Sequence, residues 1–201
     1  MLPGDVREKL RYLDDKKYEM SNAEVLLIEK EKAGSVILKC KLKNDTLIFH
    51  NPDKNPLPYL GNRNNARSCP DEFLFELDDD DTWILHIMEF KKTINTSSMK
   101  KSKIQFIMGI YNARAIAGFM NIKIKKIYIY SAYRNDNIET ISPTTLIEMR
   151  NANSSKEDLE LIKEWKNKEW KLNIDLQTIV FEHEKIQLDK NGEGTCTLKC
   201  S

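Results

Sequence analysis

Two apolar runs in the middle of the chain flank a short acidic segment. Residues 70–92 read PDEFLFELDDDDTWILHIMEFKK, in which runs rich in Phe, Leu, Ile and Trp are separated by residues 78–82. Two such runs joined by a short polar turn predict a β-hairpin. A five-residue loop at 78–82 would set Leu77 opposite Trp83 and, at the other end of the ladder, Asp71 opposite Glu89.

The chain before this hairpin shows helical and strand patterns in turn. Residues 5–33 are predicted to form one or two helices, because Ser21-Asn22-Ala23-Glu24 resembles a capping box at the start of an apolar segment. Residues 35–43 and 46–50 read as strands split by a polar dipeptide, which predicts a second hairpin. Residues 51–69 are rich in Pro and Asn and predict a loop.

The chain after the hairpin alternates between long helical patterns and strands. Residues 97–120 predict a helix with apolar side chains recurring along one face, and residues 124–133 predict the next strand. A charged helix is expected at 156–171, and the Asn191-Gly192 dipeptide favours a third hairpin. These alternating helices and strands describe an α/β protein.

Three polar side chains gather at the open end of the central hairpin. Side chains alternate along a strand, so Glu89 and Lys91 point to the same side of the sheet, near Asp71. Carboxylates that face each other destabilise a sheet unless their charge is neutralised. A divalent cation would neutralise them, and hard oxygen ligands indicate Mg²⁺ or Mn²⁺ as the cofactor.

The Pro70-Asp71 and Glu89-Phe90-Lys91 pair resembles the motif of the PD-(D/E)XK nuclease superfamily. The resemblance implies that Asp71, Glu89 and the carbonyl of Phe90 hold the metal, and that Lys91 assists the attacking water or the scissile phosphate. It also implies a restriction-endonuclease-like core over about residues 20–133, in which a mixed central sheet is flanked by helices. Residues 134–201 would then be a C-terminal α+β elaboration of a single domain, 1–201. The competing interpretation is an ordinary amphipathic hairpin with a polar end.

Several other titratable residues are candidates for the same site. In the family an N-terminal Glu often joins the metal ligands; Glu24 is preferred here, with Glu19 and Glu29 as alternatives. Glu76 alternates to the face opposite Asp71 and ranks low, and His86 is interpreted as structural because it alternates away from Glu89 and Lys91. His50 is kept as an alternative, since viral cap-snatching endonucleases place a His in a related site.

The net charge of +1 hides a basic block in which residues 91–126 contain no acidic side chain. Phosphate contacts by Lys and Arg dominate nucleic-acid affinity, so this block predicts a polyanion partner. The alternative is a solvated helix face balanced by acids elsewhere, such as those in residues 157–169. The residues expected to contact nucleic acid are Lys100, Lys101, Lys103, Gln105, Arg63 and Arg67.

Composition limits the class of protein. The chain is 40% hydrophobic and 31% charged, which is typical of a soluble globular domain. No apolar run approaches the length of a membrane span and no signal core is present, so we expect a cytoplasmic protein without a membrane partner. The four cysteines are then expected to be reduced thiols, with a Cys196–Cys200 disulfide as the alternative.

These observations together predict a metal-dependent phosphodiester hydrolase, most simply a DNA endonuclease of the restriction or antiviral-defence type. RNA remains an alternative substrate, as for a cap-snatching endonuclease. A catalytically silent module that binds nucleic acid or a partner on the same fold is the alternative from another class. The C-terminal third could serve a homodimer or a partner-protein interface.

Overall fold

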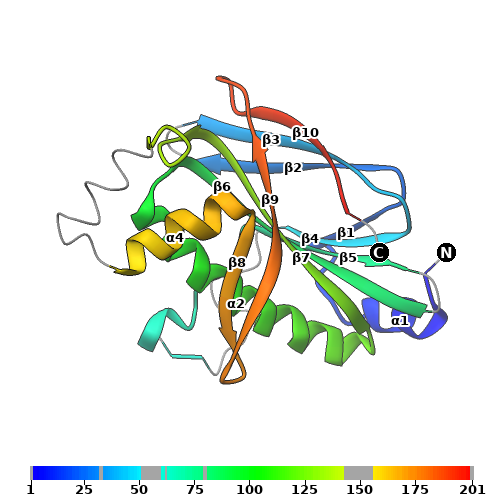
Figure 1. Ribbon diagram of the computed structural model, residues 1–201. Coiled ribbons are helices and arrows are strands. Elements are labelled where there is room, and N and C mark those ends of the chain that lie inside the picture. The colour runs from blue at the N-terminus through cyan, green and yellow to red at the C-terminus, as the bar shows by residue number, and fades with distance from the viewer. Residues whose placement is uncertain are drawn as a thin grey trace.

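A computed structural model describes residues 2–31, 34–50, 60–61, 63–78, 81–142 and 156–199. The protein has a mixed α/β architecture in which a seven-stranded sheet lies between a layer of helices and a three-stranded sheet (Figure 1). No helix among these residues is both long and apolar enough to cross a membrane.

The seven-stranded sheet is mixed in direction. Its strands β6, β7 and β9 run parallel to one another, whereas every other neighbouring pair is antiparallel. In spatial order the strands are β1 (Tyr18–Ser21), β4 (Thr46–His50), β5 (Glu72–Leu77), β6 (Thr82–Ile94), β7 (Lys123–Asp136), β9 (Gln177–Gln187) and β8 (Glu169–Ile174).

The three-stranded sheet joins segments from both ends of the chain. Strand β3 (Gly34–Lys41) lies in its centre, antiparallel to β2 (Glu24–Glu31) and parallel to β10 (Glu193–Thr197). At Cys40 and Cys196, which are paired in register, the two thiol sulfurs lie 3.0 Å apart as free cysteines.

In the described part of the chain, three α-helices and a short 3₁₀ helix, η1 (Arg63–Asn65), accompany the sheets. Helix α1 (Gly4–Leu10) and helix α4 (Lys156–Asn167) both pack against the long helix α2 (Thr96–Met120). A capping box opens α2, because Asn95 accepts a hydrogen bond from the Ser98 amide while Ser98 accepts one from Asn95. Helix α2 supplies the crossover that the parallel strands β6 and β7 require.

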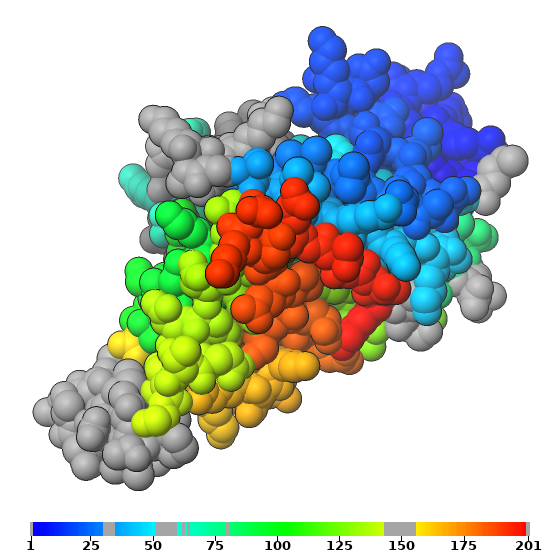
Figure 2. Space-filling view, turned by 90° about the horizontal axis from the view of Figure 1, so that it is seen from above, coloured from blue at the N-terminus to red at the C-terminus, as the bar shows by residue number. Residues whose placement is uncertain are grey.

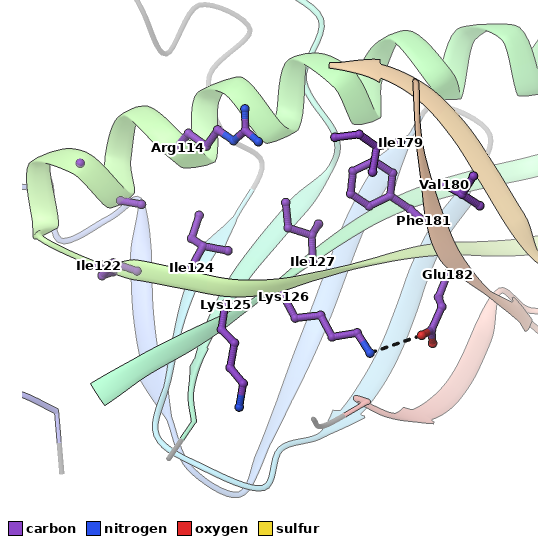
Figure 3. A pocket seen from close by; sticks show the side chains of 12 residues that line it. Arg114, Ile122, Ile124, Lys125, Lys126, Ile127, Ile179, Val180, Phe181 and Glu182 are labelled. Atoms are coloured by element: carbon purple, nitrogen blue, oxygen red, sulfur yellow. Dashed lines mark hydrogen bonds and ion pairs between the residues drawn. The ribbon is translucent and has the colours of Figure 1, made fainter. Parts of the chain in front are cut away.

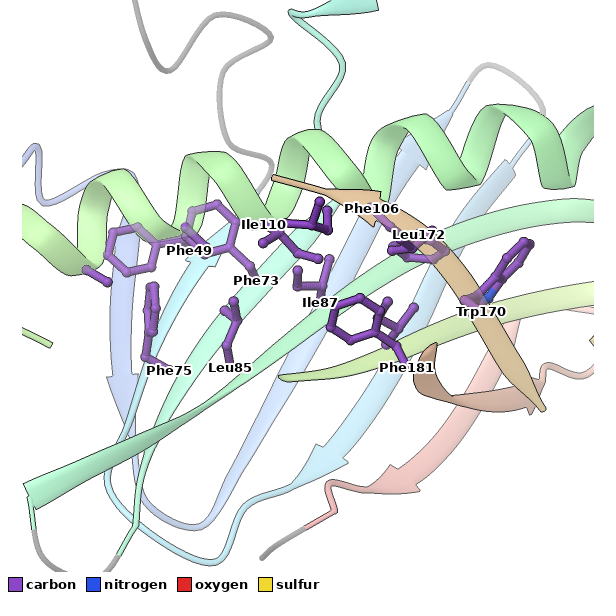
Figure 4. Close-up of a cluster of buried hydrophobic side chains, with 14 of the residues drawn as sticks. Phe49, Phe73, Phe75, Leu85, Ile87, Phe106, Ile110, Trp170, Leu172 and Phe181 are labelled. Atoms are coloured by element: carbon purple, nitrogen blue, oxygen red, sulfur yellow. The ribbon is translucent and has the colours of Figure 1, made fainter. Parts of the chain in front are cut away.

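Both faces of the central strands are buried, which explains their nearly continuous apolar sequences. On the helical side, Phe73 and Phe75 of β5 and Ile87 of β6 pack against Phe106 and Ile110 of α2 (Figure 4). On the other side the alternate residues of these strands meet the small sheet in a second cluster that includes Leu27, Leu38, Leu74, Ile84 and Met88.

The structure confirms the central hairpin and the two elements that follow it directly. Strands β5 and β6 pair antiparallel with Leu77 opposite Trp83, the predicted register. Helix α2 and strand β7 agree with the predicted helix at 97–120 and the predicted strand at 124–133.

The helical prediction for residues 5–33 is wrong beyond α1. Residues 18–21 and 24–31 form β1 and β2, and the Ser21 hydroxyl bonds to the Glu24 carbonyl between them. In β2, Val25 and Leu27 are buried, whereas Leu26 and Ile28 are about half exposed. Burial alternates along β2 because only one face of the strand packs on the core. The apolar run VLLI is hydrophobic at every position, so the sequence itself shows no such alternation.

Two predicted hairpins are wrong in their pairing, although their strands exist. Strands β3 and β4 belong to different sheets, and so do β9 and β10 on either side of the turn at Gly192. The charged helix ends at Asn167, not at residue 171 as predicted. The next residue, Lys168, has a positive φ of 57°, and β8 begins at Glu169. Strands β8 and β9 extend the central sheet, so residues 169–187 are part of the core architecture.

Candidate functional site

The three residues of the hairpin motif come together at the end of β6, beneath the first turns of α2. Asp71 precedes β5, and its Oδ2 accepts a hydrogen bond of 2.7 Å from the Phe90 amide. Glu89 and Lys91 lie on the face of β6 that meets α2, since they share the parity of buried Ile87. The predicted neighbourhood of Asp71, Glu89 and Lys91 is therefore present.

Glu89 is the most unusual group of the site, because its side chain is only 1% exposed. Its Oε1 pairs with the Lys91 ammonium, while its buried Oε2 has no hydrogen-bond partner among the described residues. Burial and the neighbouring charge of Asp71 raise the pKa of Glu89 to about 8, and Lys91 opposes this rise. The site thus holds a buried carboxyl group in which one oxygen, Glu89 Oε2, has no hydrogen-bond donor in the described chain.

Lys91 is held from the helix side by Gln105. The ammonium donates to Gln105 Oε1 at 3.2 Å, and Gln105 Nε2 donates to the Cys69 carbonyl at 3.2 Å. Gln105 is 9% exposed, so it links the cation to the segment that leads into Asp71. Gln105 is predicted to contact nucleic acid, and in the structure its side chain accepts a hydrogen bond from Lys91.

The segment before Asp71 is fixed by close packing on α2. Gly109 faces Pro70, and a Cβ added to Gly109 would lie 2.8 Å from the Pro70 Cγ. One turn further along, the side-chain Nδ2 of Asn112 donates to the Cys69 sulfur at 3.2 Å. A helix with a side chain at position 109 could not approach this closely, so the glycine sets the place of the Pro-Asp pair.

The structure distinguishes the three N-terminal glutamates. Glu24 pairs with Lys39 at 2.8 Å and is about half exposed, and Glu19 contacts His50 Nε2 at 3.2 Å. Glu29 is the one that reaches the site electrostatically, since its charge contributes to the raised pKa of Glu89. Five residues of β2, about 16 Å, separate it from Glu24, so the preference for Glu24 is not supported by the geometry.

His50, His86 and Glu76 form contacts on the other face of the sheet. His86 bonds through Nε2 to Glu76 at 3.1 Å and through Nδ1 to the Tyr130 hydroxyl at 3.0 Å. This agrees with a structural role for His86 and a low rank for Glu76. His50 contacts Glu72 through Nδ1 at 3.1 Å, which raises the pKa of His50.

Most cations of the basic block have acidic partners. Lys100 pairs with Glu157 and Asp158 at 3.0 and 2.9 Å, and Lys103 pairs with Glu164 at 2.7 Å. Further pairs involve Lys91, Arg114, Lys125 and Lys126. These contacts favour the alternative in which acids from elsewhere in the chain balance the block.

The other residues predicted to contact nucleic acid lie in varied settings. Lys101 is exposed on α2, and Arg63 is exposed in η1. Arg67 donates from Nε to the Leu60 carbonyl at 2.8 Å, a contact within its own loop. Residues 51–59 of this loop lie outside the described part of the chain.

A metal would find a partly built site here. Within the residues that the structure describes, no group of three or more His, Cys, Asp or Glu side chains is arranged to hold a metal ion. Asp71 and Glu89 nonetheless supply two neighbouring carboxylates, and the unpartnered Glu89 Oε2 is an available ligand. Their hard oxygen atoms suit Mg²⁺ or Mn²⁺ better than a soft metal.

A hollow of about 660 Å³ lies elsewhere, where α2, β7 and β9 diverge (Figure 3). Ile124 and Ile127 of β7, Phe181 of β9 and Arg114 of α2 line it, and Lys126 pairs with Glu182 at its rim. It adjoins the first half of β7, whereas Glu89 pairs with Ser131 in the second half. The hollow is therefore separate from the carboxylates.

Compared with known proteins, the chain matches no protein-family model, no curated protein and no solved structure.

Proposed function

We propose that this protein is a metal-dependent nuclease that hydrolyses phosphodiester bonds on a restriction-endonuclease-like fold. The observation that carries the proposal is the buried Glu89 carboxylate, which has Asp71 and Lys91 as neighbours and one oxygen without a partner. A purely structural carboxylate is normally satisfied when it is buried, so this one is an exception that a cation would explain.

Each residue of the site has a role in this proposal. Asp71 and Glu89 would hold Mg²⁺ or Mn²⁺, with the Phe90 carbonyl as a further ligand. When bound, the cation would supply a Lewis acid that lowers the pKa of water and stabilises charge on phosphorus. Lys91 would orient the water or the scissile phosphate with its ammonium, and Gln105 would keep Lys91 in place.

The substrate follows from the family resemblance alone. Double-stranded DNA is the usual target of PD-(D/E)XK enzymes, so we propose a DNA endonuclease of the restriction or antiviral-defence type. RNA is the alternative substrate. A silent binding module is the alternative function, and the paired cations of the basic block do not select between these possibilities.

Cleavage assays with single-site variants test the proposal. Plasmid DNA and single-stranded RNA are incubated with wild type, Asp71→Asn, Glu89→Gln and Glu24→Gln in Mg²⁺, Mn²⁺ or EDTA. We expect metal-dependent cleavage by wild type and by Glu24→Gln, which changes an exposed carboxylate that pairs with Lys39. Asp71→Asn and Glu89→Gln should be inactive.

Two results would contradict the proposed nuclease. Cleavage that persists in both Asp71→Asn and Glu89→Gln would remove the carboxylates from the mechanism. Salt-sensitive binding of nucleic acid by wild type, without cleavage in any metal, would select the silent module instead.

A further inference from the structure

A second cleft, with a volume of about 590 Å³, opens where the parallel strands β6, β7 and β9 end. Its lining includes Lys92 of β6, Arg134 and Asn135 of β7, and Lys190 in the turn after β9. In Figure 2, residues near the end of β7 (yellow-green) lie beside the turn between β9 and β10 (red). In open α/β sheets, ligands bind outside the carboxyl ends of the strands, which is where this cleft lies.

Arg134 is held in a fixed position in this cleft. Its Nη2 donates to the Ser35 carbonyl at 2.7 Å, and its guanidinium packs against Gly192. A Cβ on Gly192 would lie 2.5 Å from Nη2, and the residue has a positive φ of 87°. The Arg134 Nε is buried without a hydrogen-bond partner in the described chain, so the guanidinium keeps an unused donor.

The charge of the cleft is not neutralised, in contrast to that of α2. Lys92, Arg134 and Lys190 form no ion pair within the described ranges. Asp189 is the acidic group among the lining residues, and its carboxylate accepts the amides of Asn191 and Glu193 at 2.9 and 2.8 Å. Three cations lie around one carboxylate that is already hydrogen-bonded to backbone amides, and this arrangement favours an anionic ligand.

The cleft and the candidate metal site share strand β6. Lys92 follows Lys91 directly and lies three residues, about 10 Å, beyond Glu89 on the same strand. Because side chains alternate, Lys91 turns toward α2 while Lys92 turns toward the cleft. A polyanion engaged at Glu89 could therefore continue around the end of the sheet to Lys92.

We propose that this cleft binds backbone phosphates of the nucleic-acid strand that is cleaved at Glu89, an inference that rests on the proposed nuclease function. Arg134 would donate to a phosphate in a fixed geometry, and Lys92 and Lys190 would add charge from the two sides. The cleft then replaces the paired lysines of α2 as the principal phosphate contact.

Binding measurements at several salt concentrations test the cleft without cleavage. Wild type and the double variant Lys92→Ala/Lys190→Ala are each titrated into fluorescein-labelled duplex DNA, single-stranded DNA and RNA in EDTA. Fluorescence anisotropy gives the binding affinity at each salt concentration. Removing two phosphate contacts should lower the slope of log K against log salt by about 1.8 for duplex or about 1.4 for a single strand. Arg134→Lys keeps the charge but loses the planar fork, so it should weaken binding with little change in slope.

A matched control removes the same charge elsewhere. Lys123→Ala/Lys163→Ala changes two exposed lysines, one at the start of β7 and one on α4, and should keep the wild-type slope. Equal slopes for the cleft variant, the control and wild type would overturn the proposed phosphate site. If wild type still cleaves nucleic acid in a metal-dependent way, the proposed nuclease function would stand without that site. A reduced slope in the cleft variant without cleavage in any metal would overturn the nuclease and retain the cleft as a phosphate-binding site.

Discussion

At the scale of single residues, Glu89 shows how a buried ionisable group can mark a binding site. Its carboxyl group is buried beside Asp71, and one oxygen has no hydrogen-bond partner in the described chain. A bound divalent cation should stabilise wild type by about 2.7 kcal/mol at one hundred times its dissociation constant. Thermal unfolding with and without Mn²⁺ measures this gain.

Matched variants make this first prediction specific. Glu89→Gln should lose the Mn²⁺-dependent rise in melting temperature, whereas Glu24→Gln should keep it. An equal rise in wild type and Glu89→Gln would mean that the cation binds elsewhere.

Lys91 supplies the second prediction at this scale. Replacing it with Ala should lower turnover by roughly 10²–10⁴-fold, because a positioned cation near the reacting phosphate is lost. Mn²⁺ affinity, measured by calorimetry, should stay within a few-fold of wild type, because an ammonium is not a metal ligand. A collapse of Mn²⁺ affinity in Lys91→Ala would contradict this division of roles, and Lys123→Ala serves as the exposed control.

At the scale of elements, helix α2 positions the motif through a contact between glycine and proline. Gly109→Ala would place a methyl group 2.8 Å from Pro70, so we expect Pro70 and Asp71 to shift and turnover to fall at least ten-fold. Gly118→Ala, in the same helix, meets no atom within 4 Å and should stabilise the protein by up to about 1 kcal/mol. Turnover and urea denaturation of both variants check this third prediction.

The elements that could be predicted from sequence are those with local signals. The hairpin of β5 and β6 has its turn between its strands, so its register and the meeting of Asp71, Glu89 and Lys91 follow from the sequence. The position of Glu29 relative to Glu89 depends on where the three-stranded sheet packs against the central sheet. Nothing in residues 24–31 specifies that packing. Strand β3 pairs with β10 across 156 residues of sequence, a pairing that local patterns cannot show.

At the scale of the whole molecule, buried imidazoles tie stability to pH. His183 bonds to Ser131 through Nε2 at 2.9 Å and is packed against Trp165 and Trp170. Burial, with the nearby charge of Lys185, holds its pKa well below the usual value. The folded protein therefore keeps His183 neutral, while the unfolded chain takes up a proton below about pH 6.5.

This difference gives a fourth prediction with a definite sign. Below about pH 6.5 the free energy of unfolding of wild type should fall relative to His183→Gln, by about 1.4 kcal/mol per pH unit. His50→Gln should show the reverse, because Glu72 raises the pKa of His50 and its contribution is lost as pH rises. Urea denaturation at pH 5, 6 and 7 measures both, and a pH-independent difference for His183→Gln would contradict the assignment.

The parallel pairing of β10 with β3 also has a consequence for biosynthesis. Strand β3 is made early, yet its neighbour at residues 193–197 leaves the ribosome 156 residues later. Until then one edge of the small sheet stays open, and an open strand edge invites pairing with other chains. We therefore expect nascent chains that end before residue 193 to depend on chaperones, and their release from ribosomes without chaperones to give aggregates.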